Sequence, residues 1–551
     1  MFKEKSGQPF ELFANSRYRN HFVYLALFIM YLPMAWLGFH PHHEGLMLAT
    51  LNLTADALAQ NLPIPFNQYG YLWMLPFLPF NFLPLNGYTF LAQRLTSIIL
   101  IFISSFLIYK ISRYFFSEKF SIFISIFFLS TYSYGQPSLL WPSIPGQTSL
   151  LLLTYSILRF LQNNHQAYLF VASFSSFILI GSRIQIGIAA VFATFALLRV
   201  AKLNKKSWSY LIYVSALLLL YVFLLSTKGY LNYAFFDSLI YPFEYLDRSQ
   251  ANWTFPRTSI VIFIVLLLLL LLLTKSDKQN RLLAILAYSN AFLAIVLLLT
   301  FYTNPQLFHK LYSRTYVAVL FLFIFLLVSS LLSTFSKSKL HTFQEKSLFI
   351  YGAIGSIQLF PNFDAFHGWY ASAPLIITFP LILKKNQIFQ KLTASIVFKF
   401  LQFNLSFLVT LFSIQSINAY MSDSQPFPLE QVKGIRLSNS QFDDFQNEFD
   451  FFKVNIPRHS KVLNLCPNAD PFFERGYWTN ATRFLVFWPP LEKPFFKDPA
   501  ILESEFIVSC IDVENLGTEA TQLLSRNFQL METVAFLGSW GLDWKIYYKI
   551  K

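Results

Sequence analysis

The chain has 551 residues, of which 55% are hydrophobic, 19% are aromatic and only 13% are charged. A soluble domain carries about twice that charged fraction, so the composition excludes an ordinary water-soluble globular protein. The formal net charge of +14 does not indicate a nucleic-acid-binding protein. Most Lys and Arg residues lie in short gaps between apolar segments, and little soluble surface is left for a phosphate backbone.

Long apolar segments recur along the chain, one of them containing unbroken leucine from Leu266 to Leu273. A helix needs about 20 apolar residues to cross a bilayer, so the sequence predicts an all-α polytopic membrane bundle of about thirteen transmembrane helices. The first segment is too long for a signal-peptide core, and no small-residue cleavage site follows it. The predicted spans are 22–39, 90–112, 119–135, 145–162, 166–182, 184–200, 208–226, 258–274, 282–302, 314–334, 347–361, 368–384 and 394–417.

Positive charge alternates between the gaps that separate these spans. Gaps on the side of the N-terminus carry clusters such as Lys202, Lys205 and Lys206, whereas the opposite gaps carry few cations. Because cytoplasmic loops hold the excess of Lys and Arg, we expect the N-terminus in the cytoplasm and the C-terminal tail outside. A bacterial inner (cytoplasmic) membrane fits this orientation, and an endoplasmic reticulum membrane with a lumenal tail is the alternative.

The first outer loop, 40–89, opens with Phe39-His-Pro-His-His-Glu-Gly45. This order places Glu44 at the water-accessible outer edge of the bilayer, where a carboxylate can deprotonate an acceptor hydroxyl within hydrogen-bond reach. An ordinary polar loop and a zinc site built from His40, His42 and His43 are the alternatives. The apolar segment 45–60 that follows is expected to lie flat on the membrane as an interfacial helix.

Further candidates lie near the outer ends of later spans. Arg94 and Arg183 sit in or beside apolar segments, where a charge is costly unless it reaches the interface or binds an anion such as phosphate. Asp364 and His367 are spaced to share a helix face and can bind a substrate hydroxyl or pair with each other. Asp237, in the outer segment 227–257, is interpreted as loop surface.

Residues 1–423 form the predicted transmembrane domain, and 424–551 form a predicted soluble, extracytoplasmic α/β domain. In this tail we expect helices at 440–452 and 518–526 and strands at 461–466, 505–511 and 544–550, arranged in a partly parallel sheet. No glycine-rich phosphate loop follows a strand. The cysteines, Cys466 and Cys510, are either a disulfide or two buried thiols.

Four of these features together resemble the GT-C superfamily of membrane glycosyltransferases, which use polyprenyl-phosphate sugars. They are the long outer loop with His43-Glu44-Gly45 followed by Tyr69-Gly70, the stretch Gly181-Ser-Arg-Ile-Gln-Ile-Gly187, Asp364-Ala-Phe-His367 before a late span, and the outer tail. The chain departs from the family in having a single Glu where Asp is usual, often paired with a second acid.

The resemblance implies transfer of a sugar from a polyprenyl-phosphate donor to a glycan, lipid or protein acceptor. Glu44 would activate the acceptor hydroxyl, and the reaction would invert the anomeric carbon. Some family members need a divalent metal; no other cofactor is expected. Arg183 and Arg94 would bind the donor phosphate, and the substrate-binding candidates are His42, His43, Tyr69, Asp364 and His367.

Three other functions fit the same architecture. A lipid or polysaccharide transporter or flippase needs ionisable groups along the middle of several spans, whereas in this chain they gather at the outer ends. A surface-polysaccharide polymerase or ligase would use a similar donor, and a non-catalytic membrane assembly protein would use the tail to recruit partners. In every case membrane lipids surround the bundle, and no nucleic acid is expected.

Overall fold

The computed structural model describes most of the chain, with gaps that take in all or nearly all of four predicted spans at 258–274, 282–302, 314–334 and 394–417. The total of about thirteen spans therefore stays a prediction. The described residues are 24–29, 31–39, 41–67, 69–135, 139–241, 264, 324, 342–357, 365–384, 424–466, 468–486, 498–510, 518–537 and 542–550.

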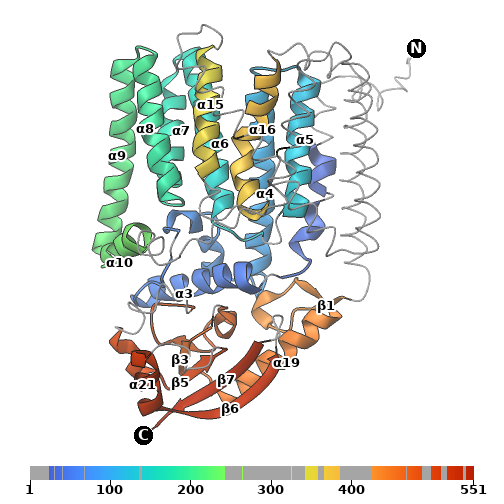
Figure 1. Ribbon diagram of the computed structural model, residues 1–551, viewed down its shortest axis with the longest axis vertical. Coiled ribbons are helices and arrows are strands. Elements are labelled where there is room, and N and C mark those ends of the chain that lie inside the picture. The colour runs from blue at the N-terminus through green and yellow to red at the C-terminus, as the bar shows by residue number, and fades with distance from the viewer. Residues whose placement is uncertain are drawn as a thin grey trace, which may run out of the picture.

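Long helices run side by side and form the larger part of the molecule (Figure 1). They coincide with the predicted spans within a few residues, and α4 and α9 are each long and apolar enough to cross a membrane. The helices are α4 (Thr89–Ser112), α5 (Glu118–Gly135), α6 (Ser143–Asn163), α7 (Gln166–Ile180), α8 (Ile184–Val200), α9 (Asn204–Thr227), α15 (Phe343–Ser356) and α16 (Ala365–Lys384).

The outward and inward faces of this bundle differ in chemistry. Large apolar side chains are exposed on the outside, such as Phe192 at 70% and Leu219 at 69%. An apolar face of this kind is what a membrane protein presents to lipid. Between helices, hydroxyl groups pair with one another, as Ser104 with Thr148 at 2.8 Å. Such pairs satisfy polar groups that lipid cannot hydrate.

Helix α3 (Leu46–Gln60) lies across one end of the bundle, between the upright helices and the tail (Figure 1). The apolar run at 45–60 predicts this helix. Met47, Leu48 and Leu51 are almost fully buried inside the protein. The apolar sequence of this helix is therefore explained by packing between the bundle and the tail, and not by the expected position on the membrane surface. The helix ends at Asn61, which adopts the left-handed conformation common at helix C-termini.

The predicted segment 22–39 is helical over 24–29 and continues into the short 3₁₀ helix η1 (Leu32–Ala35). The chain then passes through the turn η2 (Pro41–Gly45) into α3. After α3 come η3 (Leu72–Met74) and η4 (Leu78–Phe82), which return the first outer loop to α4. Beyond α9, the short helices α10 (Leu231–Phe235) and η5 (Phe236–Ile240) begin the next outer segment.

The tail contains a five-stranded sheet in the order β4-β3-β5-β7-β6. The strands β4, β3 and β5 are parallel, whereas β7 is antiparallel to both β5 and β6. This confirms the expected partly parallel sheet. The elements are β1 (Ser424–Pro426), η7 (Glu430–Val432), β2 (Arg436–Ser438), α19 (Asn439–Asn455), β3 (Lys461–Asn464), η8 (Asp470–Phe472), β4 (Thr479–Asn480), η10 (Pro499–Glu503), β5 (Phe506–Ser509), α21 (Thr518–Asn527), β6 (Phe528–Leu537) and β7 (Leu542–Lys549).

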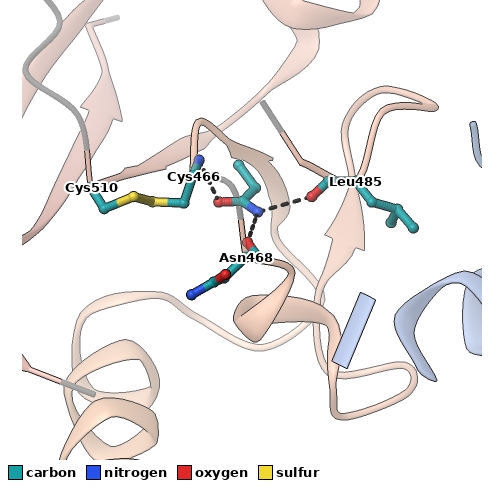
Figure 2. Close-up of a disulfide and its surroundings, with 5 residues drawn as sticks. Cys466, Asn468, Leu485 and Cys510 are labelled. Carbon is teal, nitrogen blue, oxygen red and sulfur yellow. Dashed lines mark hydrogen bonds between the residues drawn. A yellow bond between two sulfur atoms is a disulfide. The ribbon is translucent and has the colours of Figure 1, made fainter. Parts of the chain in front are cut away.

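Cys466 and Cys510 form a disulfide, which decides between the two alternatives left open by the sequence (Figure 2). Their Cα atoms are 5.3 Å apart, because the cysteines follow the ends of the adjacent parallel strands β3 and β5. The Asn464 side chain fixes this corner: it donates to Asn468 O at 2.6 Å and Leu485 O at 2.9 Å and accepts from Cys466 N at 3.1 Å.

Buried residues of the tail and of the bundle form one continuous hydrophobic core, and Phe39 lies where the two parts join. The Phe39 ring lies 5.7 Å from the ring of Phe90 at the start of α4. It also lies 5.1 Å from Phe427, 5.7 Å from Phe445 and 5.2 Å from Phe473, all in the tail. Edge-on aromatic contacts of this kind add to the free energy gained by burial, so the first outer loop is held between two packed bodies.

Candidate functional site

Glu44 lies at the end of η2 and is fully buried, not open to water as expected from the sequence. Its Oε1 accepts hydrogen bonds from Arg94 Nε at 3.1 Å, Leu139 N at 2.9 Å and Leu140 N at 3.4 Å. Its Oε2 accepts from Arg94 Nη2 at 3.4 Å. Arg94 and the backbone N–H groups at 139–140 therefore hold the Glu44 carboxyl in one position between α4 and the start of α6.

Arg94 uses all five of its N–H groups on protein acceptors. Besides the two bonds to Glu44, Nη1 donates to Ala35 O and Gly38 O, both at 3.0 Å, and Nη2 donates to Leu37 O at 3.1 Å. A guanidinium has five donors and no more. This geometry therefore does not support phosphate binding by Arg94, which instead holds the turn before η2 against α4.

Arg183 has a different environment, in the turn between α7 and α8. Its guanidinium lies 4.5 Å from the centre of the Tyr69 ring and donates to Ser143 Oγ. Within the part of the chain that the structure describes, no carboxylate lies within 4.0 Å of it, and its buried Nε has no hydrogen-bond partner. Arg183 therefore keeps the donor capacity that Arg94 lacks.

Aromatic side chains connect the surroundings of Glu44 with those of Arg183. Trp141 directly follows the two residues that donate to Glu44. Its ring lies 4.9 Å from the ring of His43 and 5.4 Å from the ring of Tyr69. The structure thus brings four predicted site residues, Glu44, His43, Tyr69 and Arg183, to one region at the end of the bundle.

A buried carboxylate that the sequence pattern places on the loop surface fixes the position of Tyr69. Asp237, in η5, is fully buried, so the surface interpretation is wrong. Its Oδ2 accepts hydrogen bonds from Asn67 N at 3.0 Å, Tyr71 Oη at 2.6 Å and Arg483 Nη2 of the tail. Burial raises the pKa of Asp237, while Arg483 and these hydrogen bonds act in the opposite direction.

The same loop is also fastened to the turn that carries Arg183. Leu72 N donates to Gly181 O at 2.9 Å. Gly70 has φ of +81°, and a Cβ there would lie 2.6 Å from Gly181 O, so the close approach requires glycine. The neighbours of Tyr69 in the chain are therefore held by Asp237 and by Gly181, and this places Tyr69 against Arg183.

The remaining predicted site residues are described only in part. His40 and Asp364 lie outside the described residues, and His42 and His367 are described by their backbone alone, in η2 and α16. Among the residues that the structure does describe, no group of three His, Cys, Asp or Glu could hold a metal ion. A space of about 20 Å³ beside Tyr69 is lined by Leu46 and Met47 of α3.

Residues 73–225 match the family described as dolichyl-phosphate-mannose-protein mannosyltransferase. The matched segment runs from the first outer loop to α9 and includes Arg94 and Arg183, but not Glu44 or the tail. It confirms the resemblance to the GT-C superfamily of glycosyltransferases that the sequence motifs indicate. No curated protein sequence matches the chain.

Solved structures with a similar course of the chain include two of the Archaeoglobus fulgidus oligosaccharyltransferase. The apo form is 12% identical, with a TM-score of 0.43, over 91% of this chain and 70% of that one. The complex with Zn and sulfate is 12% identical, with a TM-score of 0.41, over 85% of this chain and 64% of that one. ArnT from Cupriavidus metallidurans bound to undecaprenyl phosphate is 10% identical, with a TM-score of 0.43, over 96% of this chain and 97% of that one.

Proposed function

We propose that the protein is a membrane glycosyltransferase that moves a sugar from a polyprenyl-phosphate donor to an acceptor hydroxyl on the outer side of the membrane. The observation that carries this proposal is Arg183. It is a cation at the end of the bundle, inside the segment that matches the family, with no carboxylate within ion-pair distance among the described residues.

Arg183 binds the phosphate of the donor in this proposal. A forked guanidinium suits phosphate oxygens, with which it forms paired charge-assisted hydrogen bonds. As the sugar leaves, negative charge grows on the phosphate, and a fixed cation stabilises that charge. The Tyr69 ring and Ser143 Oγ hold the guanidinium in place, so little reorganisation is needed when the donor binds.

Glu44 is the proposed base, and Arg94 is its positioning residue. Among the hydrogen bonds that Arg94, Leu139 and Leu140 donate to Oε1, the one from Leu140 N is the longest, at 3.4 Å. The acceptor hydroxyl takes the place of this donor and gives its proton to Oε1 as its oxygen attacks the anomeric carbon. The bond from that carbon to the phosphate oxygen breaks, polyprenyl phosphate leaves, and the configuration inverts.

His42, His43, Tyr69, Asp364 and His367 are proposed to bind hydroxyl groups of the donor sugar or the acceptor. His43 and Tyr69 support this role, because both rings contact Trp141 beside the proposed base. No step of the proposed reaction uses a metal ion, although some members of the superfamily need one. A metal requirement of this protein would appear as loss of transfer after dialysis against a chelator.

We also propose that the tail faces an oxidising space and the N-terminus faces the cytoplasm of a bacterium. Disulfides persist in such spaces and are rare in the cytosol, and Cys466 and Cys510 are paired. The distribution of Lys and Arg between the gaps supports the same orientation.

The test measures polyprenyl phosphate released from a panel of polyprenyl-phosphate sugars by the full-length protein in lipid nanodiscs. Arg183→Gln is expected to lower the rate by about 10²–10³-fold, the usual cost of removing a donor that stabilises transition-state charge. Glu44→Gln is expected to abolish transfer in protein that still elutes as a folded monodisperse species. Arg199→Gln is the matched control, because Arg199 is an exposed cation in the last turn of α8. Wild-type rates in Arg183→Gln would contradict the proposal.

A further inference from the structure

A second space, of about 270 Å³, lies on the tail side of α3. Its inner wall is formed by Asn52 of α3, Asn81 of η4, Phe90 and Phe473, all buried. Its rim is formed by Asn86 and Thr89 before and at the start of α4, and by Gln431 and Arg475 of the tail. Residues of the first outer loop, of the start of α4 and of the tail therefore line this cavity together.

The inner wall is a fixed polar framework. Gln93 Nε2 donates to Asn81 Oδ1 at 2.7 Å, and Asn81 Nδ2 donates to Asn52 Oδ1 at 3.0 Å. Asn52 Nδ2 in turn faces Phe473 O at 3.4 Å. Each amide nitrogen carries two N–H groups, and these bonds use one on Asn52 and one on Asn81. Donors thus remain on a wall whose side chains are already positioned.

The rim carries polar groups that make no hydrogen bond within the described part of the chain. The Asn86 amide and the Thr89 hydroxyl are two of them; Asn86 is exposed and has φ of +48°. Gly87, next to Asn86, is fastened to the tail because Lys433 N donates to Gly87 O at 3.1 Å. The rim is therefore held in place while its side chains stay available.

The charge of the lining is balanced. Arg475 is the one charged residue among those that line the cavity, all of which the structure describes. Its Nε donates to Asp56 Oδ1 at 2.7 Å and its Nη1 donates to Asn81 O at 2.7 Å. Because Arg475 is already paired with Asp56, it offers little further attraction to an anionic ligand, and the lining has no acidic residue to attract a cationic one. The lining therefore suits an uncharged ligand.

We propose that this cavity binds one uncharged sugar ring. Amide and hydroxyl groups both donate and accept hydrogen bonds, as sugar hydroxyls do, and the exposed residues Leu83 and Pro84 of the lining offer apolar contact to the C–H face of a sugar. The volume lies just below the range for small-molecule sites, about 300–1,000 Å³, and suits one ring better than an extended chain. That the ring belongs to the acceptor rests on the proposed function; the binding of a sugar does not.

Saturation-transfer NMR and calorimetry on the full-length protein in nanodiscs provide the test. The probes are methyl glycosides of glucose, mannose and galactose, with glucuronic acid, glucosamine and a blocked serine dipeptide as the charged and peptide arms. Asn86→Gly removes the amide but keeps a residue that tolerates positive φ. Asn61→Gly is the matched control, because Asn61 also has positive φ, at +53°, and lies outside the cavity lining.

At least one uncharged glycoside is expected to bind saturably, with Kd raised about tenfold by Asn86→Gly, the equivalent of one good hydrogen bond. Thr89→Val should weaken binding in the same direction, and Asn61→Gly should leave Kd unchanged. Saturable binding by the charged sugars or the peptide alone, no binding at all, or equal Kd values in Asn86→Gly and wild type would each overturn the proposal.

The transfer assay separates this proposal from the function proposed above. If Asn86→Gly raises the KM for the acceptor while kcat stays the same, the bound ring is part of the acceptor. An unchanged KM overturns that assignment. If the wild-type protein releases no polyprenyl phosphate from any donor but binds a glycoside through Asn86, the sugar site stands and the proposed function fails.

Discussion

At the scale of single residues, Glu44 and Arg94 form a buried ion pair at the end of the bundle. Removing one partner of such a pair leaves a buried charge uncompensated, which costs about 3–5 kcal/mol. We therefore expect Arg94→Met to lower the free energy of unfolding by about that amount, because Glu44 is fully buried. Thermal or denaturant unfolding of the protein in detergent micelles, followed by circular dichroism, measures the loss.

The double variant Arg94→Met/Glu44→Gln separates the pair from the packing around it. If the loss in Arg94→Met comes from a buried carboxylate that has lost its guanidinium, neutralising that carboxylate should recover part of the stability. A double variant that loses the full sum of the two single losses would show that the two side chains act independently, and the account of the pair would fail.

A second residue-scale prediction concerns Glu448 in α19 and Asp470 in η8, which are both buried. Burial raises the pKa of Asp470 to about 7. Burial also raises the pKa of Glu448 well above its usual range, and the neighbouring charge of Asp470 raises it further. Both carboxyls therefore bind protons more tightly in the folded tail than in the unfolded chain.

The sign of the pH dependence follows from this difference. A group whose pKa is raised on folding stabilises the protein at low pH, and that contribution is lost as pH rises through the folded value, about 7 for Asp470. We expect the unfolding temperature of wild type to fall between about pH 5 and pH 8, and that of Asp470→Asn to fall less. Asp443→Asn, an exposed acid in the same helix as Glu448, should follow wild type. Parallel curves for Asp470→Asn and wild type would contradict the assignment.

At the scale of elements, α3 depends on a close contact at the residue that precedes its first turn. A Cβ on Gly45 would lie 2.2 Å from Phe473 Cζ. Gly45→Ala is therefore expected to destabilise the junction of α3 and tail by about 1–3 kcal/mol, the usual cost of overpacking. Limited proteolysis and thermal unfolding measure the effect.

Phe473→Leu provides the compensating change, since a shorter side chain leaves room for the added methyl group. Adding it to Gly45→Ala should restore part of the lost stability. Gly146→Ala in α6 is the matched control: its Cβ would lie 3.5 Å from the nearest atom, an ordinary contact. A loss in Gly146→Ala as large as that in Gly45→Ala would show that the clash with Phe473 is not the cause.

The elements differ in how well the sequence predicts them. Helices such as α4 and α9 are predicted because an apolar run of that length has few other structures. Strand β6 is not predicted, because it follows α21 with no intervening turn residue and a register shift near Leu530 breaks the alternation of a regular strand. The pairing of Asp237 with Arg483 joins residues 246 positions apart, and no local pattern contains that information.

The site follows the same rule. Arg183 stands out in the sequence because a cation beside an apolar segment needs an explanation. The sequence separates it from Arg94 only by the stretch 181–187 that resembles the GT-C superfamily, since both cations stand in or beside apolar segments. Only the fold shows that backbone carbonyls at 35–38 and Glu44 take up every N–H group of Arg94.

At the scale of the whole molecule, the tail supports the candidate site through the loop that carries Tyr69. Phe39 joins the cores of the two bodies, and Arg483 of the tail reaches Asp237, which positions the loop that carries Tyr69. A change that loosens the tail should therefore disturb the surroundings of Arg183, although no hydrogen bond or ion pair joins Arg183 to the tail in the part of the chain described.

The disulfide offers a way to loosen the tail without touching the site. Cys466 and Cys510 are 44 positions apart, and closing a loop of that length in the unfolded chain is worth about 4 kcal/mol by chain-entropy estimates. We expect Cys466→Ala/Cys510→Ala to lower the unfolding temperature and to lower transfer less than Arg183→Gln does.

Alkylation of the denatured wild-type protein should detect no free thiol before reduction and two afterwards. Two free thiols in unreduced protein from an oxidising compartment would contradict the pairing, and equal transfer losses in the double variant and Arg183→Gln would mean that the tail governs the site more directly than its contacts indicate.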